Sequence, residues 1–277
     1  MRKRIEKDKL IAYMIIALGA IIMLAPFYFM FVFSSHSNSG ILSVPPPILF
    51  GDYLVENFNT LLEFLPYFWH NLGLSLYVAI VTTLLNLLFC SLAGYAFAMF
   101  EFKYKNAMFV GIMATMLIPP FLGMIPTAMI MSTIGWMNDT KALIIPAACG
   151  AMGIFMMRQF IASSIPKELV EAARMDGCGE FKIYYRIIVP LIKPAFGTLG
   201  LITFIGSWNN FMGPLVVMND MKMFTVPLAL RALQGTGQVP WGAVSIGAAI
   251  AVLPLLFLFI LASRRLIDGL TAGAVKG

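Results

Sequence analysis

The densest group of charged side chains in this sequence lies in one polar stretch between two apolar runs, Ile165 to Pro194. Its charged residues are Lys167, Glu168, Glu171, Arg174, Asp176, Glu180, Lys182, Arg186 and Lys193. Carboxylates and cations at this density make ion pairs and hydrogen bonds, and the segment is too long to be only a turn. We interpret it as a site that a partner protein grips on one side of a membrane.

Nothing in the sequence predicts catalysis by this chain. The nucleotide-binding pattern G-x-x-x-x-G-K-[ST] is absent. The two histidines, His36 and His70, fall in or near one polar connection, and no Ser/His/Asp arrangement supports a nucleophile. We therefore expect no enzyme site, no metal site and no cofactor bound by this chain.

The positions of the acidic residues are also informative. All 13 Asp and Glu residues lie in polar connections or at the ends of apolar runs. Transporters driven by protons or ions usually need a carboxylate near the middle of the membrane. If this chain moves a solute against a gradient, the energy must come from another polypeptide.

Uncharged polar residues do occur inside the apolar runs. We expect Thr82 and Asn86 to make hydrogen bonds between helices. Another run interleaves aromatic and hydrogen-bonding residues: Phe204, Ser207, Trp208, Asn209 and Asn210. That combination suits a neutral polyhydroxylated solute such as a sugar, and we expect these five residues to line its path.

Composition identifies the elements that must position these residues. The chain of 277 residues is 60% hydrophobic and 12% charged, whereas soluble domains carry about 25% charged residues. Apolar runs this long are typical of helices rather than barrel strands. We predict an all-α integral membrane protein whose six spans cover 11–33, 72–100, 107–133, 142–162, 195–218 and 241–262.

Several local signals refine these spans. Pro119, Pro120 and Pro126 should kink or break the third span, either as a packing bend or beside a pathway. Small residues in the fourth span, including Gly153, should allow close helix packing. Phe64 to Trp69 is predicted to form a short helix at the membrane interface.

Basic residues predict the orientation, because cytoplasmic segments are enriched in Lys and Arg. With the N-terminus inside, all but Lys141, Lys222 and Arg231 of the 19 basic residues fall on the cytoplasmic side. The predicted organisation is then a cytoplasmic N-terminus (1–10), a first helix (11–33), an external connection (34–70), a core (71–263) containing the loop 164–194, and a cytoplasmic tail (264–277).

Read as helices, the loop divides in two. Pro166 suits a first helical turn, and Gly177 and Gly179 should end that helix. We expect one face to carry Ile165, Leu169, Ala172 and Ala173, with the two alanines at the outer bend. A second helix over Glu180 to Val189 should use Phe181, Tyr184, Tyr185 and Ile188 for apolar contacts.

The same loop resembles a known pattern. Glu171-Ala172-Ala173, then Gly177, then Ile187-x-Val189-Pro190 is similar to the E-A-A…G…I-x-L-P loop of permease subunits of bacterial binding-protein-dependent ABC importers. Asp176 and the exit at Pro194 also fit, and Val189 in place of Leu is the one departure. The tail from Gly269 to Gly277 resembles that of the shorter permease of maltose-type carbohydrate importers.

This resemblance implies a type I ABC importer fold in a bacterial inner membrane and a set of partners. These are a second, related permease, two ATPase subunits that carry ATP and Mg, an external solute-binding protein and a carbohydrate substrate, with no nucleic acid. The implied ATPase-coupling residues are Glu171, Ala172, Ala173, Asp176, Gly177, Ile187 and Pro190. The implied tail contacts are Gly269, Thr271, Gly273 and Lys276.

Two alternatives stay open. The solute could be something other than a sugar, since specificity can lie in the binding protein. A secondary transporter or facilitator would need a carboxylate in mid-membrane or internal repeats, and the sequence has neither.

Overall fold

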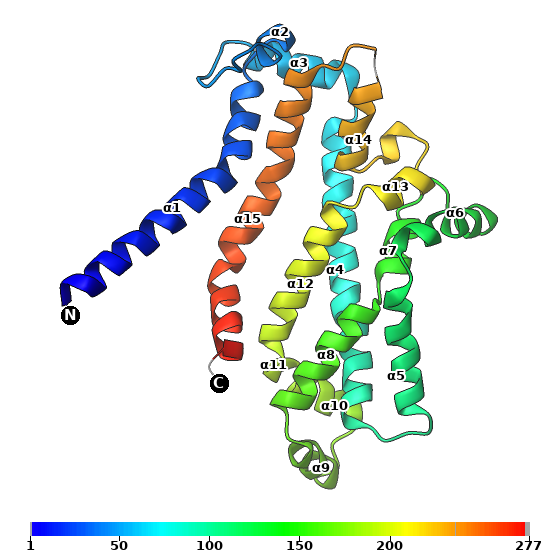
Figure 1. Cartoon of the computed structure of the whole chain (residues 1–277). Helices are drawn as coiled ribbons and strands as arrows, with labels where there is room; N and C mark the ends of the chain where they lie inside the picture. Colours follow the sequence, from blue (N-terminus) through cyan, green and yellow to red (C-terminus); the bar gives the residue numbers. More distant parts are fainter. Residues whose placement is uncertain (1, 236, 275–277) are drawn as a thin grey trace. The chain divides into compact units, whose positions relative to one another are not determined.

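Every regular secondary-structure element is a helix in the part described by the computed structural model, which covers the backbone of residues 2–235 and 237–274 and the side chains of residues 9–235 and 237–260 (Figure 1). Contacts within the chain define two compact units, Met1–Phe68 with Ala229–Pro254 and Trp69–Leu228 with Leu255–Gly277. The main helices are α1 (Arg2–Phe33), α3 (Leu54–Phe64), α4 (Phe68–Met99), α5 (Lys105–Ala114), α6 (Met124–Thr133), α7 (Lys141–Ala147), α8 (Ala151–Ser164), α9 (Lys167–Met175), α10 (Glu180–Ile183), α11 (Val189–Leu191), α12 (Lys193–Trp208), α13 (Met212–Val217), α14 (Val226–Ala232) and α15 (Trp241–Ala274).

The apolar helices agree with a membrane architecture. By length and composition, four helices among the described residues can cross a membrane: Lys9–Phe33, Phe68–Met99, Lys141–Ser164 and Trp241–Ile260. Two bent pairs, Lys105–Leu117 with Pro120–Thr133 and Glu180–Leu191 with Lys193–Trp208, raise the number to six if each pair is one span. The protein is therefore an all-α membrane protein, as predicted from composition.

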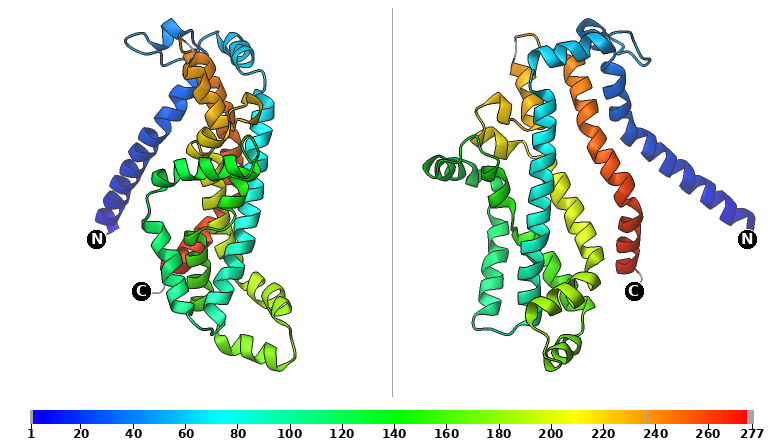
Figure 2. Two further views of the ribbon diagram at one scale, coloured as in Figure 1. Left: turned by 90° about the vertical axis from the view of Figure 1, so that its right-hand side faces the viewer. Right: turned by 180° about the vertical axis from the view of Figure 1, so that it is seen from behind.

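Proline breaks the third predicted span. The segments on either side of Pro119–Pro120 are inclined at 93°, and both views in Figure 2 show α6 turning away from α5. Proline lacks the N–H that would continue the helical ladder and its ring presses on the preceding turn. The predicted break is thus confirmed.

In the first unit, the expected short helix at Phe64 to Trp69 is not formed. The short helix is instead α3, which ends at Phe64, while α4 begins at Phe68. Pro66 falls between them and disfavours helical geometry at the residue before it. Asn57 anchors α3, since its Nδ2 donates to the carbonyls of Ser34 at 2.9 Å and His36 at 2.8 Å.

In the second unit, α4 packs closely on α8 through glycines. A Cβ added to Gly153 would lie 2.6 Å from Cys90 Sγ, and one added to Gly94 would lie 2.8 Å from the backbone nitrogen of Arg158. Only glycine permits this approach, which confirms the predicted role of small residues in the fourth span. Asn86 links three helices, donating to Ala147 O at 3.1 Å and accepting from Thr203 at 3.3 Å.

The fifth predicted span, 195–218, is interrupted. α12 ends at Trp208, and α13 starts at Met212. Asn210 stabilises the turn between the two helices, because its Oδ1 accepts the backbone N–H of Gly213 at 3.0 Å. Pro214 also lacks an N–H, so it could not have continued the ladder of α12.

Candidate functional site

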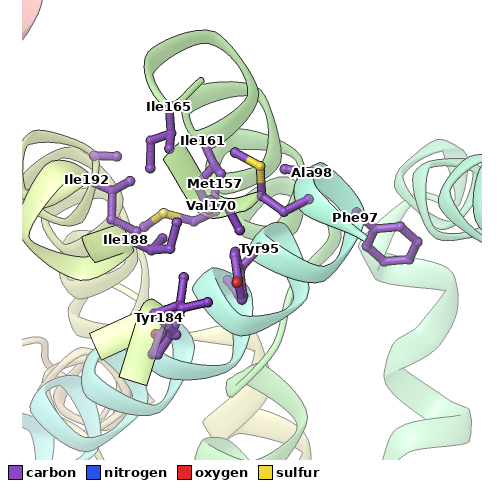
Figure 3. Close-up of a cluster of buried hydrophobic side chains, with 14 of the residues drawn as sticks. Tyr95, Phe97, Ala98, Met157, Ile161, Ile165, Val170, Tyr184, Ile188 and Ile192 are labelled. Atoms are coloured by element: carbon purple, nitrogen blue, oxygen red, sulfur yellow. The ribbon is translucent and has the colours of Figure 1, made fainter. Parts of the chain in front are cut away.

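The polar loop presents one helix, α9, beyond the ends of α4 and α8, as both views in Figure 2 show. Pro166 precedes its first turn in extended geometry, and Val170 and Ala173 are buried at 1% and 9% exposure. They belong to an apolar cluster with Tyr95 of α4 and Ile188 (Figure 3). The loop helix is therefore packed onto the membrane helices rather than tethered loosely.

The prediction that Ile165, Leu169, Ala172 and Ala173 share one face of the loop helix is wrong. Ile165 and Ala173 are buried, whereas Leu169 is 42% exposed and Ala172 is exposed. Ile165 is extended rather than helical, so counting helical positions from it gave the wrong phase. The buried residue Val170 sets the correct helical phase of α9. Of the two alanines, only Ala172 faces outward.

Gly177 ends α9 with φ +74°, a backbone conformation that disfavours residues with a Cβ. Its N–H donates to Arg174 O at 3.0 Å, and the N–H of Cys178 donates to Ala173 O at 3.0 Å. This closes the helix and reverses the chain toward α10. The predicted helix end at Gly177 is confirmed.

The second half of the loop winds differently from a simple helix. It consists of α10, a π-helical turn over Tyr184–Ile188, and α11. Pro190 lacks an N–H, and a wider turn before it relieves the pressure of its ring on the preceding carbonyl. The π turn lies where the sequence predicted an unbroken helix from Glu180 to Val189.

The apolar contacts of this half also differ from the prediction. Tyr184 and Ile188 are buried as expected, but Phe181 and Tyr185 are 82% and 72% exposed. Ile183, which the prediction omitted, is fully buried. The hydroxyls of Tyr184 and Ser91 lie 2.6 Å apart, so Tyr184 also ties the loop to α4 by a hydrogen bond.

An ion pair and a tyrosine hydroxyl join the two halves of the loop to α4. Arg174 Nε donates to Glu180 Oε1 at 2.7 Å, and the hydroxyl of Tyr95 donates to Glu180 Oε2 at 2.7 Å. The Arg174 guanidinium also lies 5.0 Å from the centre of the Phe100 ring. We call Tyr95, Arg174 and Glu180 the loop triad. Residues on both sides of the turn at Gly177 are thereby fixed to the end of α4.

The start of α9 is held at the same end of α4. Lys167 Nζ and Lys105 Nζ each lie 3.2 Å from Glu101 Oε1. The hydrogen bond from Lys105, followed in size by the one from Lys167, lowers the pKa of Glu101. Glu101 is 75% exposed, so water screens both pairs and they orient α9 more than they stabilise it.

The predicted coupling residues divide into two groups. Glu171, Ala172, Asp176, Gly177 and Pro190 are exposed, whereas Ala173 is buried and Ile187 is partly buried against the apolar cluster. In the predicted tail, Gly269, Thr271 and Gly273 lie within α15 by backbone, and Lys276 lies outside the described residues. The exposed group is available to a partner, and the buried group supports it.

The second unit also contains a cavity of about 250 Å³ between α4, α7, α12 and α13. Its lining residues are Val78 and Thr82 of α4, Leu143 and Ala147 of α7, Thr203, Gly206 and Ser207 of α12, Asn210, Pro214 of α13, and Thr225. None of these ten side chains is charged. Two predicted path residues, Ser207 and Asn210, are therefore part of its wall.

The other predicted path residues do not line this cavity. Phe204 and Trp208 are 7% and 3% exposed and stack with ring centres 6.0 Å apart, packing against Ala79. Asn209 is exposed and donates to Ile205 O at 3.0 Å. Residues four apart share a helix face, so the spacing alone could have separated Phe204 and Trp208 from Thr203 and Ser207.

Sequence reasoning missed Tyr95 and Thr225. The prediction that Thr82 bonds to another helix is wrong, because its Oγ1 has no hydrogen-bond partner within residues 9–235 and 237–260. The Arg174–Glu180 pair could have been inferred, because the two glycines between these residues predict a tight turn that brings opposite charges together. Tyr95 gave no such signal, since it sits in an apolar run and meets Glu180 only in the folded chain.

Known proteins share this architecture. Residues 87–271 match the family described as binding-protein-dependent transport system inner membrane component. The chain is 35% identical to an arabinooligosaccharides transport system permease protein of Halalkalibacterium halodurans, covering 80% of each chain. It is 31% identical to a lactose transport system permease protein of Rhizobium radiobacter, covering 100% of this chain and 98% of the relative.

Two further matches broaden the comparison. An sn-glycerol-3-phosphate transport system permease protein of Brucella abortus is 31% identical, with 95% and 96% of the two chains covered. A crystal structure of a bacterial ABC transporter involved in the import of the acidic polysaccharide alginate has the same fold, with a TM-score of 0.79 at 21% identity over 94% and 96% of the chains. This chain is thus a transport permease rather than an enzyme, and it belongs to the family of inner membrane components of binding-protein-dependent transport systems.

Proposed function

We propose that this chain is one permease of an ATP-driven, binding-protein-dependent sugar importer. It forms half of the translocation path with a second related permease, two ATPase subunits drive it, and an external binding protein supplies the solute. Both chain termini and the loop face the cytoplasm, in keeping with the distribution of basic residues. The observation that carries the proposal is α9, packed on α4 through Val170 while Glu171 and Ala172 remain exposed.

In the proposed mechanism the loop acts as a rigid lever. The ATPase docks on the exposed face of α9, which carries Leu169, Ala172 and Met175. Closure of the ATPase dimer carries α9 with it, and the loop triad passes that motion to α4. The spans then rock so that solute enters from the binding protein, and hydrolysis returns the cavity to the inside. The tail residues Gly269, Thr271, Gly273 and Lys276 approach the ATPase dimer in this proposal.

The sugar assignment rests on two observations. Two of the relatives are named for arabinooligosaccharides and lactose. The cavity walls offer hydroxyl and amide groups without a charge. A permease of the same class for a phosphorylated solute is the alternative, favoured by the glycerol-3-phosphate relatives.

The first test is co-purification of the tagged chain from native membranes in mild detergent. We expect a second permease and a P-loop ATPase to accompany it, and Glu171→Lys to remove the ATPase. Glu168→Lys is the matched control, because Glu168 lies on the same helix, is exposed and falls outside the motif. Recovery of the chain without an ATPase in several detergents would refute the importer proposal.

The second test identifies the solute class. Uptake by cells expressing the complete system is measured with lactose, an arabinooligosaccharide and sn-glycerol 3-phosphate. Uptake of a neutral sugar supports the proposal, whereas uptake confined to the phosphate ester would replace it with the alternative.

A further inference from the structure

The second half of the loop has an exposed face that the proposed lever mechanism does not use. Its two aromatic rings, Phe181 and Tyr185, are 82% and 72% exposed. Basic and aliphatic side chains are exposed beside these rings. Together they form what we call the basic-aromatic surface: Phe181, Lys182, Tyr185, Arg186, Leu191 and Lys193.

The cations of this surface lack counter-charges within the chain. Among the residues whose side chains the structure describes, none of Lys182, Arg186 and Lys193 takes part in an ion pair. The only acidic residue between positions 180 and 193 is Glu180, which is already bound by the other two members of the loop triad. The surface therefore offers three positive charges to an anionic partner.

The bend of the chain places this surface where a span begins. The segment Glu180–Leu191 is inclined at 79° to Lys193–Trp208, so it runs across the end of α12 rather than along it. Its inner side, with Ile188 and Ile192, packs into the apolar cluster on the membrane helices (Figure 3). In Figure 1, α10 and α11 lie near the end of α4, whereas α9 extends farther out. An amphipathic segment in this position lies along the membrane surface.

The groups on this surface match the headgroup region of an anionic bilayer. Exposed aromatic rings favour that depth, and Lys and Arg close to it attract anionic lipids. The guanidinium of Arg can also bind a phosphate through two hydrogen bonds. A protein partner fits less well, because the buried centres of protein interfaces are depleted in Lys.

We propose that the basic-aromatic surface binds the headgroups of anionic phospholipids. Lys182, Arg186 and Lys193 contact the phosphate groups, while Phe181 and Tyr185 enter the boundary with the acyl chains. The assignment to the cytoplasmic leaflet rests on the proposed function, whereas the contact with lipid does not. It holds the second half of the loop at the membrane surface and leaves α9 available to the ATPase.

The experiment identifies what contacts this surface. Tyr185 is replaced by the photoreactive residue p-benzoylphenylalanine in the full chain. The chain is purified with its accompanying subunits and reconstituted in bilayers of equal parts phosphatidylglycerol and phosphatidylcholine with the same acyl chains. After illumination, mass spectrometry of the cross-linked peptides distinguishes the two lipids from each other and from protein partners.

Two triple variants are compared in this background. The charge-loss variant carries Lys182→Gln, Arg186→Gln and Lys193→Gln. The matched control carries Lys182→Arg, Arg186→Lys and Lys193→Arg, which keep all three charges. Both should unfold at the wild-type temperature in a neutral detergent, because the three side chains are exposed and make no ion pair with the described part of the chain. That readout separates a loss of lipid contact from misfolding.

We expect phosphatidylglycerol adducts to exceed phosphatidylcholine adducts about fivefold or more, the factor that one Lys or Arg near an anionic lipid contributes. The ratio of the two adducts should fall to about one in the charge-loss variant and stay high in the matched control. Salt at about 1 M should lower the ratio for the wild-type surface, because it screens the attraction between the cations and the headgroups.

Cross-links to the ATPase or to another protein subunit in place of lipid would overturn the inference. Equal yields of the two lipid adducts, or equal ratios in the two triple variants, would also overturn it. The dependence of ATPase co-purification on Glu171 is measured separately, so the failure of this inference is distinguishable from the failure of the proposed function.

Discussion

Removal of a single hydroxyl from the loop triad should partly uncouple transport from ATP hydrolysis. Tyr95→Phe deletes the 2.7 Å hydrogen bond to Glu180 and leaves the ring in the apolar cluster. A hydrogen bond to a charged group contributes about 1.5–3 kcal/mol when well buried. Because the Glu180 side chain is 40% exposed, solvent screening reduces this to about 1 kcal/mol.

A double-mutant cycle measures this energy directly. Thermal unfolding of Tyr95→Phe, Glu180→Gln and the double variant should give an interaction energy of about 1 kcal/mol between the two side chains. In the reconstituted transporter, Tyr95→Phe should lower the ratio of solute transported to ATP hydrolysed more than it lowers ATP hydrolysis. The α9 lever would then move with less of its motion passed to α4.

Tyr185→Phe is the matched control, since it deletes the same group from a side chain of the same loop that is 72% exposed. An interaction energy near zero would show that the triad contributes nothing to stability. Equal transport-to-hydrolysis ratios for Tyr95→Phe and Tyr185→Phe would refute the role of the triad in passing motion to α4.

Three further predictions follow from backbone geometry and surface charge. Gly177→Ala should destabilise the protein by about 1–2 kcal/mol and impair solute uptake, because φ is +74° at this residue. Asparagine tolerates a positive φ better than alanine, so Gly177→Asn should retain more stability in thermal unfolding and more uptake than Gly177→Ala. Gly94→Ala should cost about 1–3 kcal/mol in thermal unfolding, since its Cβ would meet the α8 backbone, whereas Gly111→Ala, with no atom within 4 Å, should be neutral or stabilising. Because the pKa of Glu101 is lowered in the folded protein, its stabilising effect is complete above the unfolded pKa of 4.5 and is lost as the pH falls through the lower folded pKa. The unfolding temperature of Glu101→Gln should lack this dependence on acid pH. A pH profile equal to that of the wild type would show that the ion pairs with Lys105 and Lys167 do not contribute to stability.

Local chemistry was enough to predict the helix breaks that proline and glycine impose. Pro119 and Pro120 break a span because no helical geometry accommodates them without loss. Gly177 ends α9 because the chain must adopt a positive φ there. These effects act over a few residues, so they can be inferred without knowing what packs nearby.

Predictions that depended on counting helical positions were less accurate. The phase of α9 was misjudged from Ile165, and the π turn at Tyr184–Ile188 shifted the buried face of the second half of the loop. Pro66 and the turn at Asn210 moved two further helix ends. In each case a local irregularity changed the direction of the side chains that follow it.

The sequence alone determined that this protein is a helical membrane permease with a charged loop between two of its spans, because hydrophobicity, charge placement and a contiguous motif are properties of neighbouring residues. Only the tertiary structure brought Tyr95 to Glu180, which lie 85 residues apart, and placed Thr82, Ser207 and Thr225 around one cavity. Such sites depend on how helices from distant parts of the chain pack, and that packing follows from the combined shapes of many side chains rather than from any one segment.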